Sequence, residues 1–513
     1  MSGTYANIYQ TLGWQARRRP SSPALVDAER SLTFPALLDM VQSAALRLED
    51  KGIRHGDRVV VLADNCIETI ALLHATALLG FIMVPVNTRY SPAELQYVLG
   101  NAEPALVLYG PAYEALLGQA TQDMPMARMP IGQIAEPVAA ERLSSWRAAL
   151  GFEASAYGRV DGDDVAMLIY TSGTTSHPKG AMLTHGNLIW NSINYIMESE
   201  LRAAHSAILA TPLFHISGFG VMHGPLLHAG GTLYIVDRFS PQRILDALET
   251  FRPTHLFLVS AMWVQMTETP AFLAKRFEDV TFVSTAAGPL SAARQMAVRN
   301  AFPNAQFGWG YGMTESCVTT IKSQRTEEIE QHPGTLGYGW RHVRYRLVDE
   351  SGQVLPSLLG TGELQVKGDV VFKGYWKNPE ATQEARPEDG WLRSGDLFEF
   401  DADGFAYFRG RSKDMVKTGG ENVAAQEVEQ CVIQCPGVRD AAAFGIPDDH
   451  LGELLAVAIE VQAGASPSEN EIKAWCRNHL AGFKVPKKVF FVDALPRSSS
   501  EKPQKHKLVE MFK

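Results

Sequence analysis

The sequence predicts an α/β protein that is built on a parallel sheet and followed by a smaller domain. Unbroken apolar segments, which alternate with helical patterns, run over 58–62, 81–84, 105–109 and 231–236. Such strands are typical of a parallel sheet with both faces covered by helices. The second segment is closed by Pro85, which has no N–H for a sheet ladder and therefore suits a strand end. Because 513 residues exceed what one hydrophobic core supports, we expect at least two domains.

The later part of the chain has a different pattern. Short alternating segments, such as 362–366 and 404–408, are separated by Gly, Asp and Asn turns, which indicates a small antiparallel β subdomain. The charged segment 409–414 then precedes a helix-rich α+β pattern of about a hundred residues, the size of a small domain. We therefore expect a large domain over 1–412 and a small, mobile one over 413–513.

Composition excludes several classes of function. The net charge of −9 argues against broad nucleic-acid binding, which requires a basic face. The five cysteines are scattered and lack the pattern of a zinc site, so we expect free thiols in a cytoplasmic protein. No signal peptide is predicted. The apolar stretch 70–86 is at the short limit for a membrane span and contains His74 and Gly80, so a buried helix and strand are expected instead of an anchor.

The most informative segment is 170–180, Tyr-Thr-Ser-Gly-Thr-Thr-Ser-His-Pro-Lys-Gly, which follows the apolar run 165–169. A strand that opens into a loop rich in glycine and hydroxyls, and that ends with Lys179, is suited to an anion, because its N–H groups can form a concave nest. The Gly-Lys-Ser/Thr triplet of the common nucleotide loop is absent. A Ser/Thr-rich surface loop is the alternative interpretation.

Further segments add groups that suit a nucleotide. In 308–315 the glycines allow close approach of a flat ligand, Tyr311 offers a ring for stacking, and Glu315 is a hard oxygen ligand for Mg²⁺. Asp396 follows a Ser-Gly pair and can accept both hydroxyls of a ribose. A charged, glycine-containing stretch covers 409–422. Taken alone, these segments are also compatible with a glycine-rich strand end and ordinary turns.

In this order and spacing, the segments resemble the adenylate-forming superfamily of acyl-CoA synthetases, carrier-protein adenylation domains and luciferases. The resemblance covers nearly the whole chain, as far as Lys502, and is strongest to acyl-CoA synthetases of the 4-coumarate–CoA ligase type. It implies a large N-terminal domain of two α/β subdomains and a β-barrel, with a mobile α+β domain after it. It also implies ATP, Mg²⁺ and coenzyme A as ligands.

The resemblance assigns roles residue by residue. The residues expected at ATP are Thr171, Ser172, Gly173, Thr174, Thr175, Lys179, Ala286, Ala287, Gly288, Tyr311, Gly312, Met313, Thr314, Asp396, Arg411, Lys413 and Lys502. Those expected at Mg²⁺ are Thr171 and Glu315, and those expected at CoA are Lys417, Gly419 and Gly420. The expected catalytic residues are Lys502, Glu315, Thr314 and His215. Lys413 resembles the hinge of the small domain, and Lys502 would offset charge at the α-phosphate.

The sequence departs from the family pattern in the segment 170–180 and next to Lys502. Ser176 and Glu501 stand where glycine is usual, and Pro503 stands where an apolar β-former is usual. A non-glycine residue restricts the backbone angles, and proline removes an N–H. Glu501 also adds negative charge beside an incoming triphosphate. We expect a slower or altered first half-reaction, not its absence.

The acyl pocket is expected around Phe214, His215 and Phe219, the segment 258–263 with Trp263, and Trp309. This apolar and aromatic lining, with no evident arginine for a second carboxylate, favours a lipophilic or ring-bearing monocarboxylic acid. His215 either shapes the pocket or is a packed core histidine. The predicted function is an ATP-dependent acid–CoA ligase. The alternatives are an enzyme that loads a carrier protein and a binding protein with weakened catalysis, and the sequence leaves a homodimer open.

Overall fold

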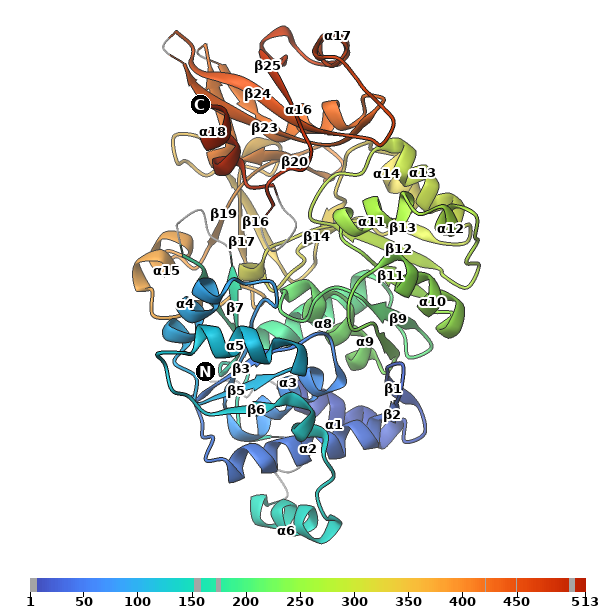
Figure 1. Ribbon diagram of the computed structural model, residues 1–513, viewed down its shortest axis with the longest axis vertical. Coiled ribbons are helices and arrows are strands. Elements are labelled where there is room, and N and C mark those ends of the chain that lie inside the picture. The colour runs from blue at the N-terminus through green and yellow to red at the C-terminus, as the bar shows by residue number, and fades with distance from the viewer. Residues whose placement is uncertain (1–6, 152–157, 172–176, 420, 449, 498–502) are drawn as a thin grey trace.

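The computed structural model describes residues 7–151, 158–171, 177–419, 421–448, 450–497 and 503–513. Figure 1 shows a large N-terminal body and a smaller one that carries the C-terminus. The large body contains two mainly parallel sheets, and a third, antiparallel sheet reaches from it toward the small body. This arrangement agrees with the predicted large α/β domain and small α+β domain.

One of the parallel sheets has the strand order β18-β8-β7-β4-β3-β5-β6. Strands β4, β3, β5 and β6 pair in parallel, as do β4 and β7, whereas β8 and β18 add antiparallel pairs at one side. The bounds are β3 (Arg58–Leu62), β4 (Ile82–Pro85), β5 (Leu106–Tyr109), β6 (Arg128–Pro130), β7 (Val165–Thr171), β8 (Lys179–Thr184) and β18 (Gly374–Tyr375). The strands predicted near 58–62, 81–84 and 105–109 are confirmed.

The other parallel sheet has the order β15-β14-β13-β12-β11-β9-β10-β1-β2. Its bounds are β1 (Pro23–Val26), β2 (Ser31–Thr33), β9 (Ser206–Leu209), β10 (Thr232–Ile235), β11 (His255–Phe257), β12 (Phe282–Ala286), β13 (Gln306–Tyr311), β14 (Ile321–Lys322) and β15 (Tyr338–Gly339). Strands β12 and β13 are parallel neighbours, so Ala286 and Tyr311 reach the same edge of the sheet. Ligands of open α/β sheets bind at the carboxyl ends of the strands.

Helices cover both faces of each parallel sheet, as the unbroken apolar strands predicted. They are α1 (Ile8–Arg18), α2 (Phe34–Asp50), α3 (Ile67–Leu79), α4 (Pro92–Ala102), α5 (Glu114–Ala120), α6 (Ala140–Leu150), α8 (His185–Glu198), α9 (Gly224–Ala229), α10 (Pro241–Phe251), α11 (Ser260–Thr267), α12 (Pro270–Leu273), α13 (Ala292–Ala301), α14 (Thr326–Gln331) and α15 (Pro379–Ala385). One hydrophobic cluster joins the facing sides of both sheets with α1, α3, α8 and α9. Separate clusters lie on the outer faces.

Helix α3 is buried on every side, because its apolar residues do not form a single stripe. The predicted buried helix and strand over 70–86 are therefore confirmed as α3 followed by β4. Over the described ranges, no helix combines the length and apolar character needed to cross a membrane. The five cysteines, which all lie in the described part, are free thiols, as expected.

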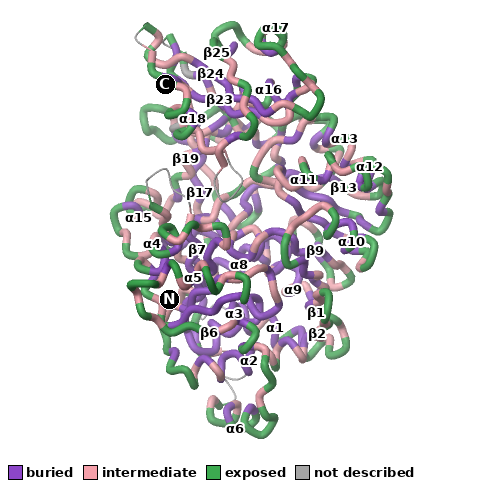
Figure 2. Tube along the Cα trace, in the orientation of Figure 1, coloured by how far each residue is buried: buried purple, intermediate pink, exposed green. Residues whose placement is uncertain are grey.

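The third sheet and the small domain follow in the order predicted. The third sheet is antiparallel, with β16 (Arg344–Val348), β17 (Gly360–Lys367), β19 (Leu392–Phe400) and β20 (Ala406–Arg411). The small domain comprises β21 (Met415–Thr418), β22 (Glu421–Ala424), α16 (Ala425–Ile433), β23 (Val438–Asp448), β24 (Gly452–Val461), α17 (Glu469–His479), β25 (Lys488–Val492) and α18 (Lys505–Phe512). It has hydrophobic clusters of its own. Figure 2 shows buried residues along the strands of each body and exposed ones at α6 and α17.

Candidate active site

A tyrosine, a carboxylate and a guanidinium meet where β13 approaches the third sheet. Tyr311 at the end of β13 donates its hydroxyl hydrogen to Asp396 Oδ2 at 2.7 Å. Arg411 faces Asp396 across the β19–β20 pair and donates from Nε to Asp396 Oδ1 at 3.1 Å. Asp396 is buried. Burial of Tyr311, together with the negative charge of Asp396, raises the pKa of Tyr311 well above its ordinary value. Tyr311 therefore remains a hydrogen donor, and the carboxylate keeps lone pairs for further donors.

Glu315 lies in the short helix η4 (Thr314–Ser316), close to β8, one of the two strands that flank the predicted anion-binding loop. Its Oε1 accepts a hydrogen bond from the Tyr375 hydroxyl at 2.7 Å, and its carboxylate is buried. The Nζ atom of Lys179 lies 5.5 Å from the centre of the Tyr375 ring. Thr171 is the register partner of Lys179 in the β7–β8 pair. The structure thus brings Thr171, Lys179 and Glu315 to one place, and Tyr375 connects them.

The donor set at Glu315 fits Mg²⁺. One carboxylate and hydroxyl oxygens are hard ligands, and Mg²⁺ is commonly held by one or two carboxylates together with substrate phosphates and water. Within the described ranges, no cluster of three or more His, Cys, Asp and Glu side chains is arranged to hold a metal ion. These residues therefore suit an ion that arrives with a phosphate ligand, and they do not form a cage of protein ligands.

The loop after β12 is held in an unusual backbone conformation. Ala287 has φ of 70°, in the left-handed region that residues other than glycine rarely adopt. Ser260, the first residue of α11, donates its hydroxyl hydrogen to the Gly288 carbonyl at 2.5 Å and also lies 3.3 Å from the Ala286 carbonyl. Because Ala286 is the register partner of Gly310, this loop lies beside the glycine-rich end of β13. Two of the segments expected at ATP, 286–288 and 311–314, are therefore adjacent.

Tyr375 was not identified as a site residue from the sequence, and Ser260 was expected only as part of the segment 258–263 near the acyl pocket, not beside the Ala287 loop. Tyr375 lies far along the chain from the anion loop, and β18 brings it to β8 as the partner of Ala181. The only local signal was the glycine followed by two aromatic residues at 374–376. Ser260 has no motif around it, because its contact with the Ala287 loop depends on the packing of α11 against β12.

The predicted acyl-pocket residues form separate groups. Phe214 and His215 pack with ring centroids 4.7 Å apart. Phe219 lies in η3 (Gly218–His223), a π-helix, which is a form often found at functional sites. Phe219 belongs to the hydrophobic cluster between the two sheets, whereas Trp263 and Trp309 belong to the cluster on the outer face of the second sheet.

Trp263 is fully buried on α11, where it packs against Phe272 and Phe302. Trp309 is 9% exposed on β13, and its backbone N–H donates to Ser323 at 2.8 Å. Trp309 thus lies on the same strand as Tyr311, and Trp263 belongs to the same hydrophobic cluster as Trp309. The role of all these residues at an acyl group stays a prediction.

Several predicted residues lie on or near the small domain. Lys413 is in η5 (Ser412–Asp414), a short helix that begins directly after Arg411. The backbone N–H groups of Lys417 and Gly419 donate to Glu453 and to the Leu451 carbonyl, within the small domain itself. The predicted residues outside the described ranges are Ser172, Gly173, Thr174, Thr175, Ser176, Gly420, Glu501 and Lys502.

The remaining predicted residues belong to the turn between β13 and η4. The Met313 N–H donates to the Ser316 hydroxyl at 3.3 Å, and the Thr314 carbonyl accepts from the Cys317 N–H at 3.0 Å. The backbone at Gly312 is packed so closely that an added Cβ would lie 1.5 Å from the Val318 carbonyl oxygen. This turn places Glu315 after Tyr311 and allows glycine alone at 312.

Comparison with known proteins identifies the class. The family model described as AMP-binding enzyme matches residues 12–376, and that described as AMP-binding enzyme C-terminal domain matches residues 427–502. The chain therefore belongs to the AMP-binding enzymes, the adenylate-forming superfamily that the sequence resembled. Within it the chain falls in the acyl-CoA synthetase branch, as an AMP-forming acid–thiol ligase.

The similar proteins match over almost their whole length. A feruloyl-CoA synthase of an Amycolatopsis species is 34% identical over 507 residues, covering 98% of this chain and 99% of that protein. The long-chain-fatty-acid–CoA ligase FadD13 of Mycobacterium tuberculosis is 31% identical over 516 residues, with 98% and 99% covered. The crystal structure of ATP-bound MatB from Rhodopseudomonas palustris is 30% identical, covers 99% of both chains and has a TM-score of 0.84. Its apo form, with the same identity and coverage, has a TM-score of 0.76.

Proposed function

We propose that the chain is an ATP-dependent carboxylic acid–CoA ligase that works through an acyl-AMP intermediate on a lipophilic or aromatic monocarboxylic acid. The observation that carries the proposal is the convergence of Asp396, Arg411 and Tyr311 with the Glu315–Tyr375–Lys179 group. The first group suits a ribose and a base, and the second suits phosphates and a divalent cation.

In the first half-reaction, a carboxylate oxygen of the acid bonds to the α-phosphorus of ATP, and the bond to pyrophosphate breaks. The remaining lone pairs of Asp396 accept the ribose hydroxyls, while the bond from Arg411 orients the carboxylate. Lys179 adds positive charge beside the phosphates. Glu315 and Thr171 would hold Mg²⁺, which neutralises charge on the phosphate oxygens. Lys502 would stabilise the charge that develops at the α-phosphate.

In the second half-reaction, the thiol of CoA loses its proton to water, its sulfur bonds to the acyl carbon, and AMP leaves with the electron pair of the broken C–O bond. We propose that the small domain turns about Lys413 between the two steps, as in other enzymes gated by domain motion. The orientation described here is taken as that of the first step. Support comes from the higher TM-score to the ATP-bound than to the apo relative.

The substrate class rests on the residues expected around the acyl group. Phe214, Phe219 and Trp309 are aromatic, and the two relatives at 34% and 31% identity are named for a ring-bearing acid and for long-chain fatty acids. A carrier protein as the acceptor in place of CoA is the second candidate. The third candidate is a binding protein with a weakened first step, which the departures Glu501 and Pro503 favour.

A panel of carboxylic acids, assayed for pyrophosphate release with and without CoA, tests the proposal. We expect one class of apolar or aromatic acid to release pyrophosphate, and CoA to be consumed in equal amount. Pyrophosphate release that never leads to a CoA thioester would favour a carrier protein as the acceptor. No release with any acid, combined with intact ATP binding, would favour the weakened binding protein and contradict the ligase.

A further inference from the structure

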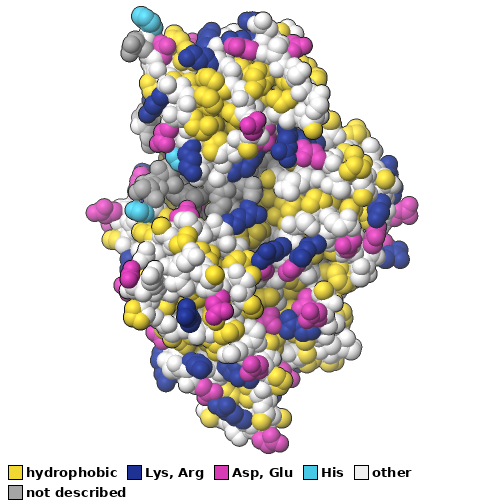
Figure 3. All heavy atoms as spheres, viewed as in Figure 1, with side chains coloured by type: hydrophobic (Ala, Val, Ile, Leu, Met, Phe, Trp, Pro, Cys, Tyr) yellow, Lys and Arg dark blue, Asp and Glu magenta, His cyan; other side chains and the backbone are white. Residues whose placement is uncertain are grey.

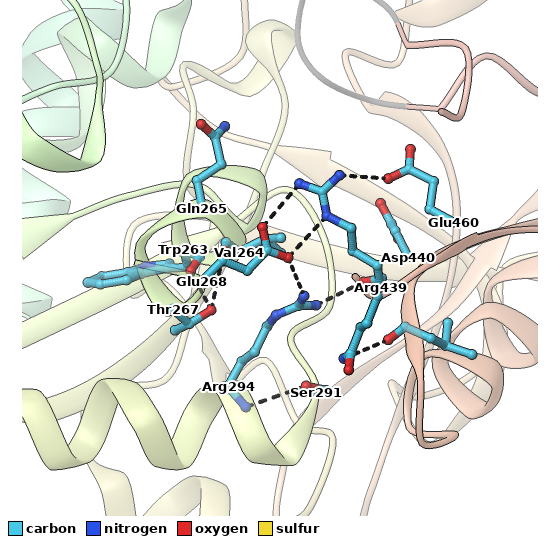
Figure 4. A network of polar contacts seen from close by, with 12 residues as sticks. Trp263, Val264, Gln265, Thr267, Glu268, Ser291, Arg294, Arg439, Asp440 and Glu460 are labelled. Carbon is cyan, nitrogen blue, oxygen red and sulfur yellow. Dashed lines mark hydrogen bonds and ion pairs between the residues drawn. The ribbon is translucent and has the colours of Figure 1, made fainter. Parts of the chain in front are cut away.

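The Glu268 carboxylate connects the two domains. Glu268 caps the C-terminal end of α11 in the large domain, and two guanidinium groups approach it from opposite sides (Figure 4). Arg439 of the small domain donates from Nε to Oε1 at 3.0 Å and from Nη2 to Oε2 at 3.1 Å. Two parallel bonds of this kind make the strongest and most directional form of ion pair. The contact therefore favours one orientation of the small domain.

Arg294 supports Glu268 from within the large domain. Its Nη2 donates to Glu268 Oε1 at 3.0 Å, and its Nη1 donates across the junction to the Arg439 carbonyl at 2.8 Å. Burial lowers the pKa of Arg294, and the negative charge of Glu268 opposes that shift. The Ala292 N–H also donates across the junction, to Gln434 Oε1 at 3.0 Å. Glu268 is thus held in place before the small domain engages it.

The contacts continue into the small domain toward the segment that contains Lys502. Arg439 Nη1 lies 3.3 Å from Glu460 Oε2, and the Glu460 side chain is only 5% exposed. Glu460 Oε1 accepts from the Leu495 N–H at 2.6 Å and from Arg497 Nη2 at 3.1 Å. Arg497 is the residue immediately before 498–502, and it forms a β-bridge with Pro503 on the other side of that segment. A continuous set of bonds therefore runs from Glu268 to both flanks of Lys502.

Figure 3 shows basic and acidic side chains next to one another where the small domain meets the large one. The Arg439 and Glu268 side chains are 38% and 39% exposed, so water screens the pair in part. A half-exposed pair contributes modest free energy. This strength suits a contact that forms and breaks during each catalytic cycle.

We propose that Glu268 and Arg439 are positioning residues for adenylate formation. Their ion pair holds the small domain in the orientation that directs the Lys502 segment to the nucleotide, and it must separate before CoA reacts. The inference rests on the proposed function and on the domain turn described with it. It predicts that the two half-reactions respond differently when the pair is removed.

The variant Arg439→Gln tests this most directly, because it leaves the Glu268–Arg294 pair and the Glu460 bonds to Leu495 and Arg497 in place. We expect formation of acyl-AMP to slow by about five- to tenfold, the effect of about 1–1.4 kcal/mol. Formation of the CoA thioester from supplied acyl-AMP should be unchanged or faster. Glu268→Gln should act in the same direction, and the double variant should be no slower than the slower single one.

A matched control is Asp279→Asn, which breaks the exposed Arg252–Asp279 pair of the large domain and does not touch the small one. It should change neither half-reaction. Equal slowing of both half-reactions in Arg439→Gln, or no slowing of either, would overturn the proposal.

A readout without catalysis separates this inference from the proposed function. Because the Ala292 N–H bonds to Gln434 across the junction, hydrogen exchange of the peptide over 291–295 reports whether the domains are engaged. We expect Arg439→Gln to speed that exchange and Asp279→Asn to leave it unchanged, even if no acid is activated. Unchanged exchange in Arg439→Gln would show that the pair does not hold the domains, whatever the reaction.

Discussion

At the scale of single residues, Asp396 is the group on which the proposed nucleotide site depends most. It receives bonds from Tyr311 and Arg411, which come from the ends of different strands, and it is buried between them. The sequence suggested its role through the resemblance to the superfamily, because a Ser-Gly-Asp segment alone also fits an ordinary turn. Its partners were not evident, because they depend on how the third sheet packs against β13.

We expect Asp396→Asn to raise the KM for ATP about 10- to 100-fold, since one or two bonds from a charged acceptor weaken. Steady-state pyrophosphate release at varied ATP measures this. Asp389→Asn is a control, because Asp389 is a carboxylate of the same region that pairs with Arg346 and lies apart from Tyr311. An unchanged KM in Asp396→Asn would remove Asp396 from the nucleotide site.

A pair of buried histidines makes stability depend on pH. His74 on α3 and His223 at the end of η3 are buried, with ring centroids 5.7 Å apart. Burial lowers the pKa of His74 to about 4 and that of His223 to about 3. Both values lie below the value of about 6.5 expected in the unfolded chain. As the pH falls, the unfolded chain therefore takes up these protons first.

The free energy of unfolding should thus keep the full contribution of these groups above about pH 6.5 and lose it progressively as the pH decreases toward about 4. We expect His74→Gln to make this dependence shallower, because one of the two groups no longer titrates. Urea unfolding at about pH 7.5 and about pH 5 measures it. His506→Gln, at an exposed position of α18, should keep the wild-type dependence. A slope in His74→Gln equal to the wild-type slope would contradict the expectation.

At the scale of elements, the end of β13 shows how backbone packing limits the sequence. An added Cβ at Gly312 would lie 1.5 Å from the Val318 carbonyl oxygen, in the turn that places Glu315. At Gly310, two residues earlier, the nearest atoms would be 3.8 Å away, on Thr285 and Thr319. Both glycines belong to the same motif, and only the structure distinguishes their roles.

Gly312→Ala should destabilise the protein by about 3 kcal/mol, because the turn must move to avoid overlap with the Val318 backbone. Gly310→Ala should stay within about 1 kcal/mol of the wild type, since its Cβ meets ordinary contact distances. Thermal unfolding of the two variants in parallel measures the difference. Equal stability of both would contradict the packing described for the turn.

At the scale of the whole molecule, the proposed function depends on how the small domain meets the large one. Lys502→Ala should lower acyl-AMP formation by about two to three orders of magnitude, because charge at the α-phosphate loses its stabilising partner. ATP binding, measured by calorimetry, and thioester formation from supplied acyl-AMP should persist. Lys507→Ala, at an exposed position of α18, is the matched control and should keep all three. An unchanged adenylation rate in Lys502→Ala would exclude the assigned role.

Much of the architecture was predictable because apolar strands and helices alternate over long stretches. The strands near 58–62, 81–84 and 105–109, the buried segment 70–86 and the antiparallel third sheet all appear where the patterns placed them. The site was predictable only in part. Thr171, Glu315, Tyr311 and Asp396 carry their chemistry in local motifs, whereas Tyr375 and Ser260 have no motif that indicates a role.

The sequence by itself indicated the class of chemistry and the order of the groups expected to carry it. It did so through the combination of segments, because each segment alone also fits an ordinary loop or turn, whereas their shared order and spacing resemble one superfamily. Only the tertiary structure decided which groups touch. Tyr311 contacts Asp396, which lies 85 positions later in the sequence, and Glu268 contacts Arg439, which lies 171 positions later. Such contacts depend on strand register and on the packing of one domain against the other, which no local pattern of residues records.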